Sequence, residues 1–452
     1  MFRHRVAGLH KLLEKAFGIS STNIISPTRT PAVNGLFSRH LLQPLPFSPF
    51  RSFCGNHISN FNSVSLQMIN YALGLARSQK TEAAYAEALL VLEQGLTSQS
   101  QEGTEATENT KGVVLLAISS LLSERGNTDE AMRALLMIQD LSCSSVGVRV
   151  AAMEALIGLN LELGLDDTSS VLADKCLKLL EHEDMEIGDE YGRKVFSARS
   201  KAIKGLVELV HGDMESAKGF FEGCQTESCI GNASLSYGVF LHAKRDFNAA
   251  KELYQKVIAE SSEKKDFSDP HDFGACNMSP EEVLLAAMCA LGQLESHLGN
   301  FGDAEEIMTR ALKKAEELFG THHPKVGTVL TCIALMYRQK ATAERSSSLL
   351  IQEGLYRKAI DLLKAPALET DDAKADVEHV RENVDRRDIV ALARGGYGEV
   401  LCVQQNRNAE GERMKRWAED WWRNRRLSLA EALDISESSK VLVVDTRICR
   451  AL

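Results

Sequence analysis

The stretch GNFGDAEEIMTRAL, residues 299–312, places a glycine five positions before an alanine at the start of a helical pattern. Similar stretches begin at Gly126 (GNTDEAMRALLMI), Gly212 (GDMESAKGFFEGC) and Gly354 (GLYRKAIDLLKA). Glycine adopts the left-handed conformation that ends one helix and turns the chain into the next. The recurring stretch therefore predicts a series of helix–turn–helix units.

Small residues recur at two fixed slots around each turn. One slot lies seven positions before the glycine, as at Ser119, Gly205 and Gly292, and the other lies five positions after it. Small side chains let two helix axes approach, and a large residue four positions further on packs beside the contact. Each pair leaves an apolar face uncovered, so neighbouring pairs must stack. The second slot holds Ala88, Ala131, Ser169, Ala217, Ala250, Ala304 and Ala359.

This pattern resembles the tetratricopeptide repeat, a helix–turn–helix unit of about 34 residues. The best copy, residues 285–320, runs into FGTHHPKV at 319–326, which is similar to the LGxxHPxVA connector of kinesin-light-chain repeats. The resemblance covers residues 66–366 and extends faintly over 385–424. It implies an all-α fold, a right-handed α-solenoid of antiparallel helix pairs in which the first helices line a concave groove.

The slots are 33 to 55 residues apart, so most repeats carry extra residues. Polar segments at 261–280 and 341–353 are predicted to be surface loops. About seven helix pairs are expected over residues 61–366. Residues 367–452 are interpreted as a degenerate pair, capping helices that carry three tryptophans, and a tail that forms either a strand or a last docked helix.

The first 60 residues have a different composition from the rest. Glu14 is the only acidic residue before Glu82, and serine is plentiful. Near the start, apolar residues fall on one helical face and lysines on the other. This composition is typical of an organellar transit peptide, predicted here to be a disordered mitochondrial targeting presequence, with the chloroplast and a merely basic N-terminus as alternatives. The apolar face comprises Phe2, Val6, Leu9, Leu13 and Phe17.

Composition and charge argue against nucleic-acid binding and against a transmembrane segment. The chain has 452 residues, of which 44% are hydrophobic and 25% charged, and its formal net charge is -10. Removal of residues 1–53, which contain seven basic residues and one acidic residue, changes this to -16, a charge that repels phosphate backbones. No apolar run is long enough for a transmembrane segment. The ten cysteines have no dense spacing and are read as reduced, mostly core residues.

No pattern for catalysis, metal or cofactor binding was found. HEDME at 182–186 lacks the second histidine of a zinc helix, and RGGYGE at 394–399 lacks the Gly-Lys-Ser/Thr of a phosphate loop. No Ser, His and Asp spacing suggests a nucleophile. We therefore predict a chain that is not an enzyme and that uses no cofactor.

The family resemblance assigns the partner-binding role to side chains of the first helices. Their mixture of amides, guanidinium groups and imidazoles suits a peptide, so the partners are expected to be other proteins or peptides and not nucleic acid. The predicted function is a mitochondrial protein–protein interaction scaffold that acts as an assembly or quality-control factor, and the alternative is an organellar RNA-binding helical-repeat protein. The sequence indicates no oligomeric state. The predicted partner-binding residues are Asn70, Arg77, Arg199, Asn232, His242, Gln293, His297 and Arg338.

Overall fold

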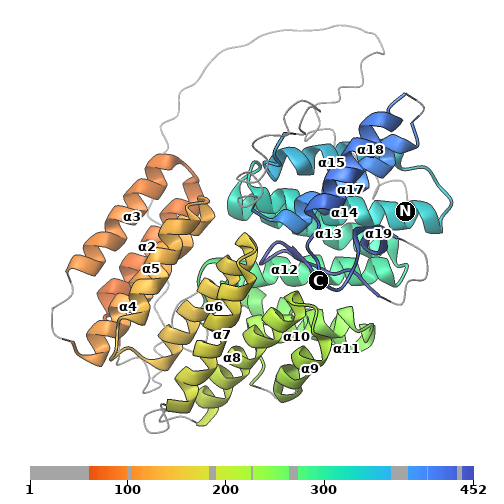
Figure 1. The fold of residues 1–452 in the computed structure, drawn as a ribbon. Coiled ribbons are helices and arrows are strands. Elements are labelled where there is room, and N and C mark those ends of the chain that lie inside the picture. Colours follow the sequence, from red (N-terminus) through yellow and green to blue (C-terminus); the bar gives the residue numbers. More distant parts are fainter. Residues whose placement is uncertain are drawn as a thin grey trace, which may run out of the picture. The chain divides into compact units, whose positions relative to one another are not determined.

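Helices joined by short turns make up most of the chain in the computed structural model (Figure 1), which describes residues 61–98, 103–182, 190–224, 228–263, 273–367, 385–404, 406–434 and 440–452. The helices are α2 Ser63–Gln79, α3 Glu82–Thr97, α4 Glu105–Glu124, α5 Thr128–Gln139, α6 Val146–Leu163, α7 Asp166–His182, α8 Glu190–Val210, α9 Met214–Phe221, α10 Gly231–Ala243, α11 Phe247–Glu263, α12 Pro280–His297, α13 Phe301–Phe319, α14 Pro324–Ala343, α15 Leu349–Leu362, α17 Arg387–Cys402, α18 Asn408–Trp421 and α19 Leu429–Leu433. The short 3₁₀ helices are η2 Glu222–Cys224 and η4 Cys276–Met278, and the strands are β1 Val444–Asp445 and β2 Arg450–Ala451.

Glycines end the first helices of several pairs, as the sequence predicted. Gly126, Gly212 and Gly299 all have φ close to +80°, in the left-handed region that a side chain disfavours. The prediction was wrong for Gly354, which lies inside α15. In that pair, α14 ends at Ala343, so most of the predicted loop at 341–353 is helical and the turn is shorter.

The small-residue slots form the helix–helix contacts. All seven second-slot residues, from Ala88 to Ala359, are fully buried. At the first slot, a Cβ added to Gly205 would lie 2.8 Å from the ring of Phe221, the large residue of the second helix. In the pair α6/α7 the sizes are exchanged, since Ile157 fills the small slot and Ala173 the large one, and both are buried. The local volume is thereby kept.

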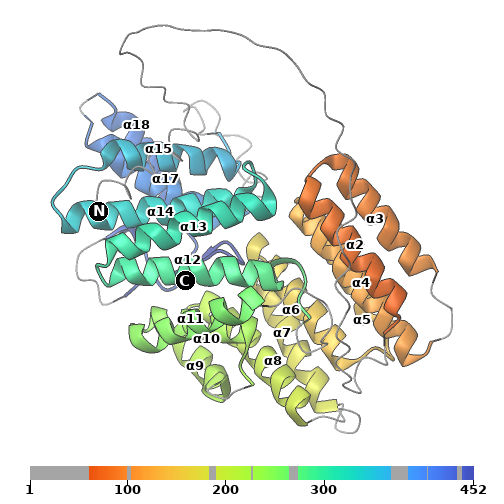
Figure 2. The same ribbon diagram turned by 180° about the vertical axis from the view of Figure 1, so that it is seen from behind.

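The pairs stack through their first helices. Each of α2, α4, α6, α8, α10, α12 and α14 packs against the next first helix, and α14 packs against α17. Second helices such as α3, α5, α7, α11 and α13 pack against the first helix of the following pair (Figure 2). This arrangement confirms the all-α repeat solenoid. We call the layer of first helices, with the side chains they direct away from the second helices, the inner face.

Part of one predicted surface loop is buried. Within the segment 261–280, residues 273–279 run against the inner face, where Phe273, Ala275, Cys276 and Met278 are at most 4% exposed. Phe273 and Cys276 belong to the same apolar cluster as α2, α4 and α6. Residues 261–263 belong to α11, residues 264–272 lie outside the described residues, and the later part is an apolar insertion.

The C-terminal region continues the stack. Helices α17 and α18 form another pair, in which Trp417 stacks on Trp421 at 4.9 Å between ring centroids and the guanidinium of Arg394 lies 3.8 Å from the Trp417 ring. The tail then forms the short antiparallel hairpin of β1 and β2.

Contacts divide the chain between residues 59 and 60, and residues 60–452 form one unit. The predicted presequence, residues 1–60, lies outside the described residues, and the predicted domain boundaries stay predictions. Among the helices that the structure describes, none is long and apolar enough to cross a membrane.

Candidate protein-binding face

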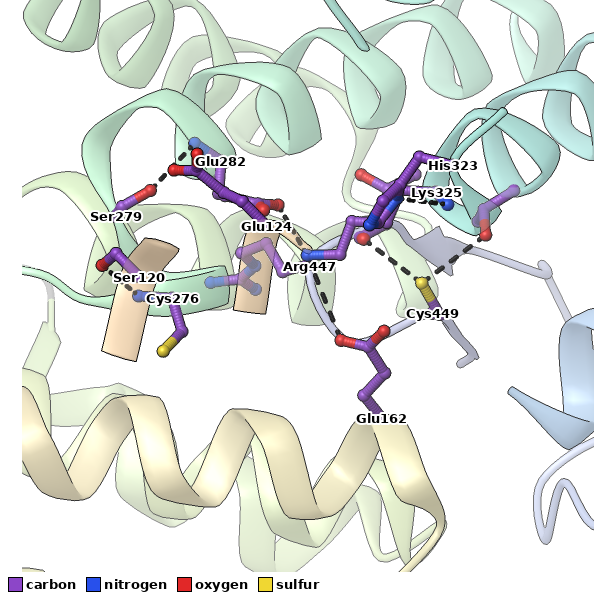
Figure 3. Close-up of polar contacts among 12 residues, drawn as sticks. Ser120, Glu124, Glu162, Cys276, Ser279, Glu282, His323, Lys325, Arg447 and Cys449 are labelled. Carbon is purple, nitrogen blue, oxygen red and sulfur yellow. Dashed lines mark hydrogen bonds and ion pairs between the residues drawn. The ribbon is translucent and has the colours of Figure 1, made fainter. Parts of the chain in front are cut away.

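Lys325 lies at the centre of a buried ionic cluster on the inner face (Figure 3). It comes from the first turn of α14, directly after the His-Pro connector, and its Nζ lies 2.8 Å from Glu282 of α12 and 4.0 Å from Glu162 of α6. All three side chains are at most 8% exposed. Three repeats therefore meet through one ammonium group.

The charges of this cluster are set by burial and by their neighbours. Burial disfavours the charged form of Lys325, but Glu282 and Glu162 outweigh it and raise the pKa of the ammonium. Burial raises the pKa of Glu282 to about 7, against the lowering effect of Lys325. Burial acts in the same way on Glu162, yet Arg386 and Lys325 together lower its pKa. Arg386 lies 2.6 Å from Glu162, so this carboxylate has two cationic partners.

A second ionic cluster joins the first repeats to α12. Arg77 of α2 contacts Glu124 of α4 at 2.7 Å and Glu281 of α12 at 3.0 Å. Burial raises the pKa of Glu124, although Arg77 opposes this shift. The contact between Arg77 and Glu281 spans 204 positions of the chain, so the cluster depends on the tertiary fold.

The segment 273–279 is held on the inner face by polar contacts. Arg199 of α8 donates to Glu154 of α6 and to the carbonyl of Phe273 at 2.6 Å. The amide of Cys276 donates to the hydroxyl of Ser120 on α4 at 3.0 Å. Two main-chain groups of this segment are thus satisfied by side chains of two first helices, α8 and α4.

The C-terminal hairpin occupies another part of the same face. Gln293 of α12 accepts from the amide of Val444 at 2.8 Å and donates to its carbonyl at 2.9 Å. Arg447 is fully buried; it pairs with Asp445 at 2.6 Å and donates to Ser236 at 3.1 Å and to Asn232 of α10. The inner face therefore binds both the main chain and the side chains of this segment.

Arg450 fixes the other end of the hairpin. Its guanidinium lies 2.7 Å from Asp388 of α17 and 2.7 Å from Asp166 of α7, and it donates to the carbonyl of Leu161 at 3.0 Å. Cys449, beside it, lies 3.5 Å from the hydroxyl of Thr328 on α14. The hairpin thus contacts a helix pair that lies almost 300 positions earlier in the chain.

Two histidines lie beside the hairpin. His242 Nε2 is 2.9 Å from His297 Nδ1, and His242 Nδ1 is 3.3 Å from the hydroxyl of Tyr254. Burial, with Arg245 nearby, lowers the pKa of His297 to about 4, and burial together with His297 lowers the pKa of His242. Both imidazoles are therefore neutral near pH 7.

Open hollows lie beside these contacts. A cavity of about 330 Å³ is lined by Gln293, His297, Met308 and Met336 and by Val441 and Leu442 of the tail. A wider basin of about 900 Å³ is lined by polar residues of α2–α5 and of the connector before α14, among them Tyr85, Arg125 and His323. Apolar and polar side chains together line the first hollow, and charged groups are prominent in the second.

The structure brings some of the predicted binding residues together. Asn232 and Gln293 both contact the hairpin, and His242 and His297 contact each other. Arg77 and Arg199 lie in separate polar clusters, and Arg338 pairs with Glu399 of α17. Asn70 is exposed on α2, away from these contacts. Whether a partner touches any of the eight stays a prediction.

Sequence reasoning missed the ionic residues of the inner face. Lys325 lies next to the recognised His-Pro connector, and Arg447 and Arg450 lie in the tail, for which the sequence offered two alternatives. Glu162 and Asp388 had no local signal. A pair of arginines in an otherwise apolar tail, VLVVDTRICRAL, was the available signal, because buried arginine requires acidic partners elsewhere.

The ionisable groups of the face are mostly paired or buried. Its carboxylates are paired with arginine or lysine, and no group of three or more His, Cys, Asp or Glu side chains that could hold a metal ion is present among the described residues. Burial raises the pKa of Cys276 and Cys289 to about 12, so these thiols are unreactive near neutral pH.

Comparison with known families now adds an independent finding. Residues 284–325, which include most of α12, α13 and the connector to α14, match the family model described as tetratricopeptide repeat. Residues 284–325 therefore contain a tetratricopeptide repeat. No curated protein matches the sequence. Tetratricopeptide repeats are in general non-enzymatic scaffolds for protein interactions, and the stacked helix pairs of this repeat protein have the corresponding architecture.

Proposed function

We propose that this tetratricopeptide-repeat protein is a non-enzymatic scaffold of the mitochondrion that holds a partner polypeptide on its inner face. The observation that carries the proposal is the pair of hydrogen bonds between Gln293 and the main chain of Val444. One side-chain amide satisfies both the N–H and the C=O of a residue, as a neighbouring strand would do. Such contacts recognise an extended segment through its backbone, and nearby pockets add side-chain specificity.

The surroundings of Gln293 support this use. The cavity of about 330 Å³ beside it combines methionine side chains with His297 and other polar groups. Methionine is flexible and adapts to partners of different shape. A role in the assembly or quality control of a larger complex is part of the proposal and rests on analogy with such scaffolds alone.

Affinity purification tests the interaction. An epitope would be inserted in the full-length chain at an internal exposed turn, such as 344–348. The tagged chain would be expressed in cells and recovered from purified mitochondria after cross-linking. We expect a protein to co-purify in stoichiometric amount, and a tagged, unrelated mitochondrial protein serves as control. Recovery of RNA in place of protein, with retention on heparin at moderate salt, would favour the RNA-binding alternative.

Import into isolated mitochondria tests the location. The radiolabelled full chain should become protease-protected and shortened by cleavage near Phe53, and a chain that lacks residues 2–53 should stay outside. A full chain that remains uncut and accessible to protease would contradict the mitochondrial part of the proposal and leave the scaffold part standing.

A further inference from the structure

The C-terminal segment 440–452 occupies the place at which a peptide ligand would bind. It contacts five first helices, at Leu161 on α6, Asn232 on α10, Gln293 on α12, Thr328 on α14 and Asp388 on α17. These helices form the inner face that the family resemblance assigns to partner binding. The segment therefore reaches across five repeats in the manner of a bound polypeptide.

The hairpin has little structure of its own. Each strand contains two residues, and the ladder is extended by a reciprocal pair of bonds between Val443 and Leu452 of 2.8 and 2.9 Å. Isolated two-stranded hairpins of this size are marginally stable in water at best. The segment consequently takes its shape from the inner face, as a ligand does when folding is coupled to binding.

Its recognition includes directional polar contacts. Two guanidinium groups three positions apart donate hydrogen bonds to different acceptors. Arg447 donates to Asn232 and Ser236. Arg450 donates to Asp166 and Asp388. Buried ion pairs contribute more to specificity of placement than to net stability, because desolvation offsets their attraction. Apolar side chains such as Ile448, which is fully buried, fill the space between them.

We propose that the inner face is a binding site for an extended or hairpin segment with two arginines three positions apart, and that residues 440–452 are its internal competitor. This inference rests on the proposed function and specifies the partner's chemistry. A partner segment binds when it replaces the internal segment at Gln293, Asn232 and Asp388. Tethering gives the internal segment a millimolar effective concentration, so it is preferred until a partner has additional contacts.

The test uses a labelled synthetic peptide, KVLVVDTRICRAL, under reducing conditions as the probe. The full-length wild-type chain is compared with the full-length Arg447→Ala/Arg450→Ala variant, whose own tail lacks both guanidinium groups. We expect the variant to bind the peptide at least about tenfold more tightly than the wild type by fluorescence anisotropy, because its tail competes less well. A peptide with both arginines replaced by alanine is the matched control and should bind weakly to either chain.

Specificity for the inner face is tested in the same background. Adding Asp388→Asn should weaken peptide binding to the tail variant, whereas adding Lys313→Ala on the exposed side of α13 should leave it unchanged. A folded tail variant that fails to bind the peptide, or binds both peptides equally, would overturn the inference. Circular dichroism establishes that the variant is folded.

A second experiment tests the same inference without substitutions in the tail. A protease site replaces residues 435–439 in the otherwise wild-type chain, and cleavage leaves the tail held without a covalent link. We expect labelled peptide to exchange for the cleaved tail, with excess unlabelled peptide but not the double-alanine peptide blocking exchange. If labelled peptide never replaces the cleaved tail, the tail is a permanent structural element and the inference fails. If a mitochondrial partner co-purifies but does not compete with the peptide, the scaffold proposal stands and this inference fails.

Discussion

The contacts within helix pairs and the contacts across the inner face are stabilised in different ways. Within pairs, small side chains at fixed positions allow close approach, as where Gly205 faces the ring of Phe221. Across the inner face, Lys325 and Arg450 are buried among carboxylates from distant repeats. The first kind of contact is local and depends on shape; the second is long-range and depends on charge pairing. The comparison teaches that the repeats set the scaffold, while the ionic residues distinguish this chain's inner face.

The strongest test of the comparison removes the central charge of the inner face. Lys325→Met leaves Glu282 buried without its partner, whereas Glu162 keeps Arg386. We expect a loss of about 3–5 kcal/mol in the free energy of unfolding, measured by urea denaturation at pH 8. The loss should be smaller at pH 6, because Glu282, with a pKa of about 7 even beside the lysine, can then take up a proton.

Two further variants make this result interpretable. Lys325→Met/Glu282→Gln should recover part of the loss, since no unpaired carboxylate remains at residue 282. Lys313→Met, at an exposed pair with Glu317, should change stability by less than about 1 kcal/mol. Equal effects at Lys313 and Lys325 would contradict the contrast between buried and exposed charges.

Shape dependence within the pairs is tested at Gly205. A Cβ at this position would lie 2.8 Å from the Phe221 ring, so Gly205→Ala should cost about 1–3 kcal/mol in unfolding free energy. Gly205→Ala/Phe221→Leu should restore much of it, as the size exchange of Ile157 and Ala173 indicates. Gly219→Ala, in a helix with open space around it, should instead be neutral or stabilising. Failure of the double variant to recover would argue against a local size match.

The connector between α13 and α14 provides a pH test. Burial, with Lys325 and Arg386 nearby, lowers the pKa of His323 from 6.5 to about 3. Because the folded-state pKa is depressed, the stability due to neutral His323 is present above pH 6.5 and is lost as the pH falls towards 3. His323→Asn should reduce the slope of stability against pH below 6.5 by up to about 1.4 kcal/mol per pH unit.

The neighbouring histidine is the control for this experiment. Asparagine retains a side chain able to cap α14, as His323 does by accepting from the amide of Lys325 at 3.2 Å. His322→Asn, at the adjacent exposed position, should leave the slope as in the wild type. Urea midpoints between pH 7.5 and 5 measure the slope, and unchanged slopes in both variants would mean that His323 is not held neutral by the fold.

The smallest expected effect concerns a turn. Gly299 has φ +79° and open space around its Cα, so Gly299→Ala is disfavoured by backbone conformation alone and should cost about 1 kcal/mol. Gly302→Ala, three positions later in α13 and also in open space, should stabilise by about 0.5–1 kcal/mol. Thermal unfolding of the two variants gives the comparison, and a loss at both positions would contradict it.

The part of the fold that was predicted follows from short-range patterns. The spacing of Gly299, Ala304 and Met308 determines one helix pair, and the same rule applies to most others. Gly354 misled because its spacing resembles the turn pattern while the surrounding LLIQEGLYRKAIDLL favours continuous helix. The buried segment 273–279 was predicted to be part of a surface loop, because most residues of the predicted loop 261–280 that precede it are polar.

The site was predicted less fully for a physical reason. Asn232 and Gln293 could be placed on the inner face from their positions in the repeat. Their contacts with the C-terminal hairpin could not, because Arg447 is 215 positions from Asn232 and pairs with it only in the folded stack. Periodicity gives the direction of a side chain from its helix, and it does not give the partner that arrives from a distant segment.

The position of the hairpin in the chain has a consequence for synthesis on the ribosome. Asp166 emerges more than 280 residues before Arg450, its partner in the finished fold. The helix pairs can form in order from the N-terminal side, but the carboxylates of Asp166 and Asp388 are not paired with Arg450 until residues 440–452 arrive. Stacking of the helix pairs and neutralisation of these carboxylates are therefore separate events. The second event requires Arg450, which is synthesised after α19.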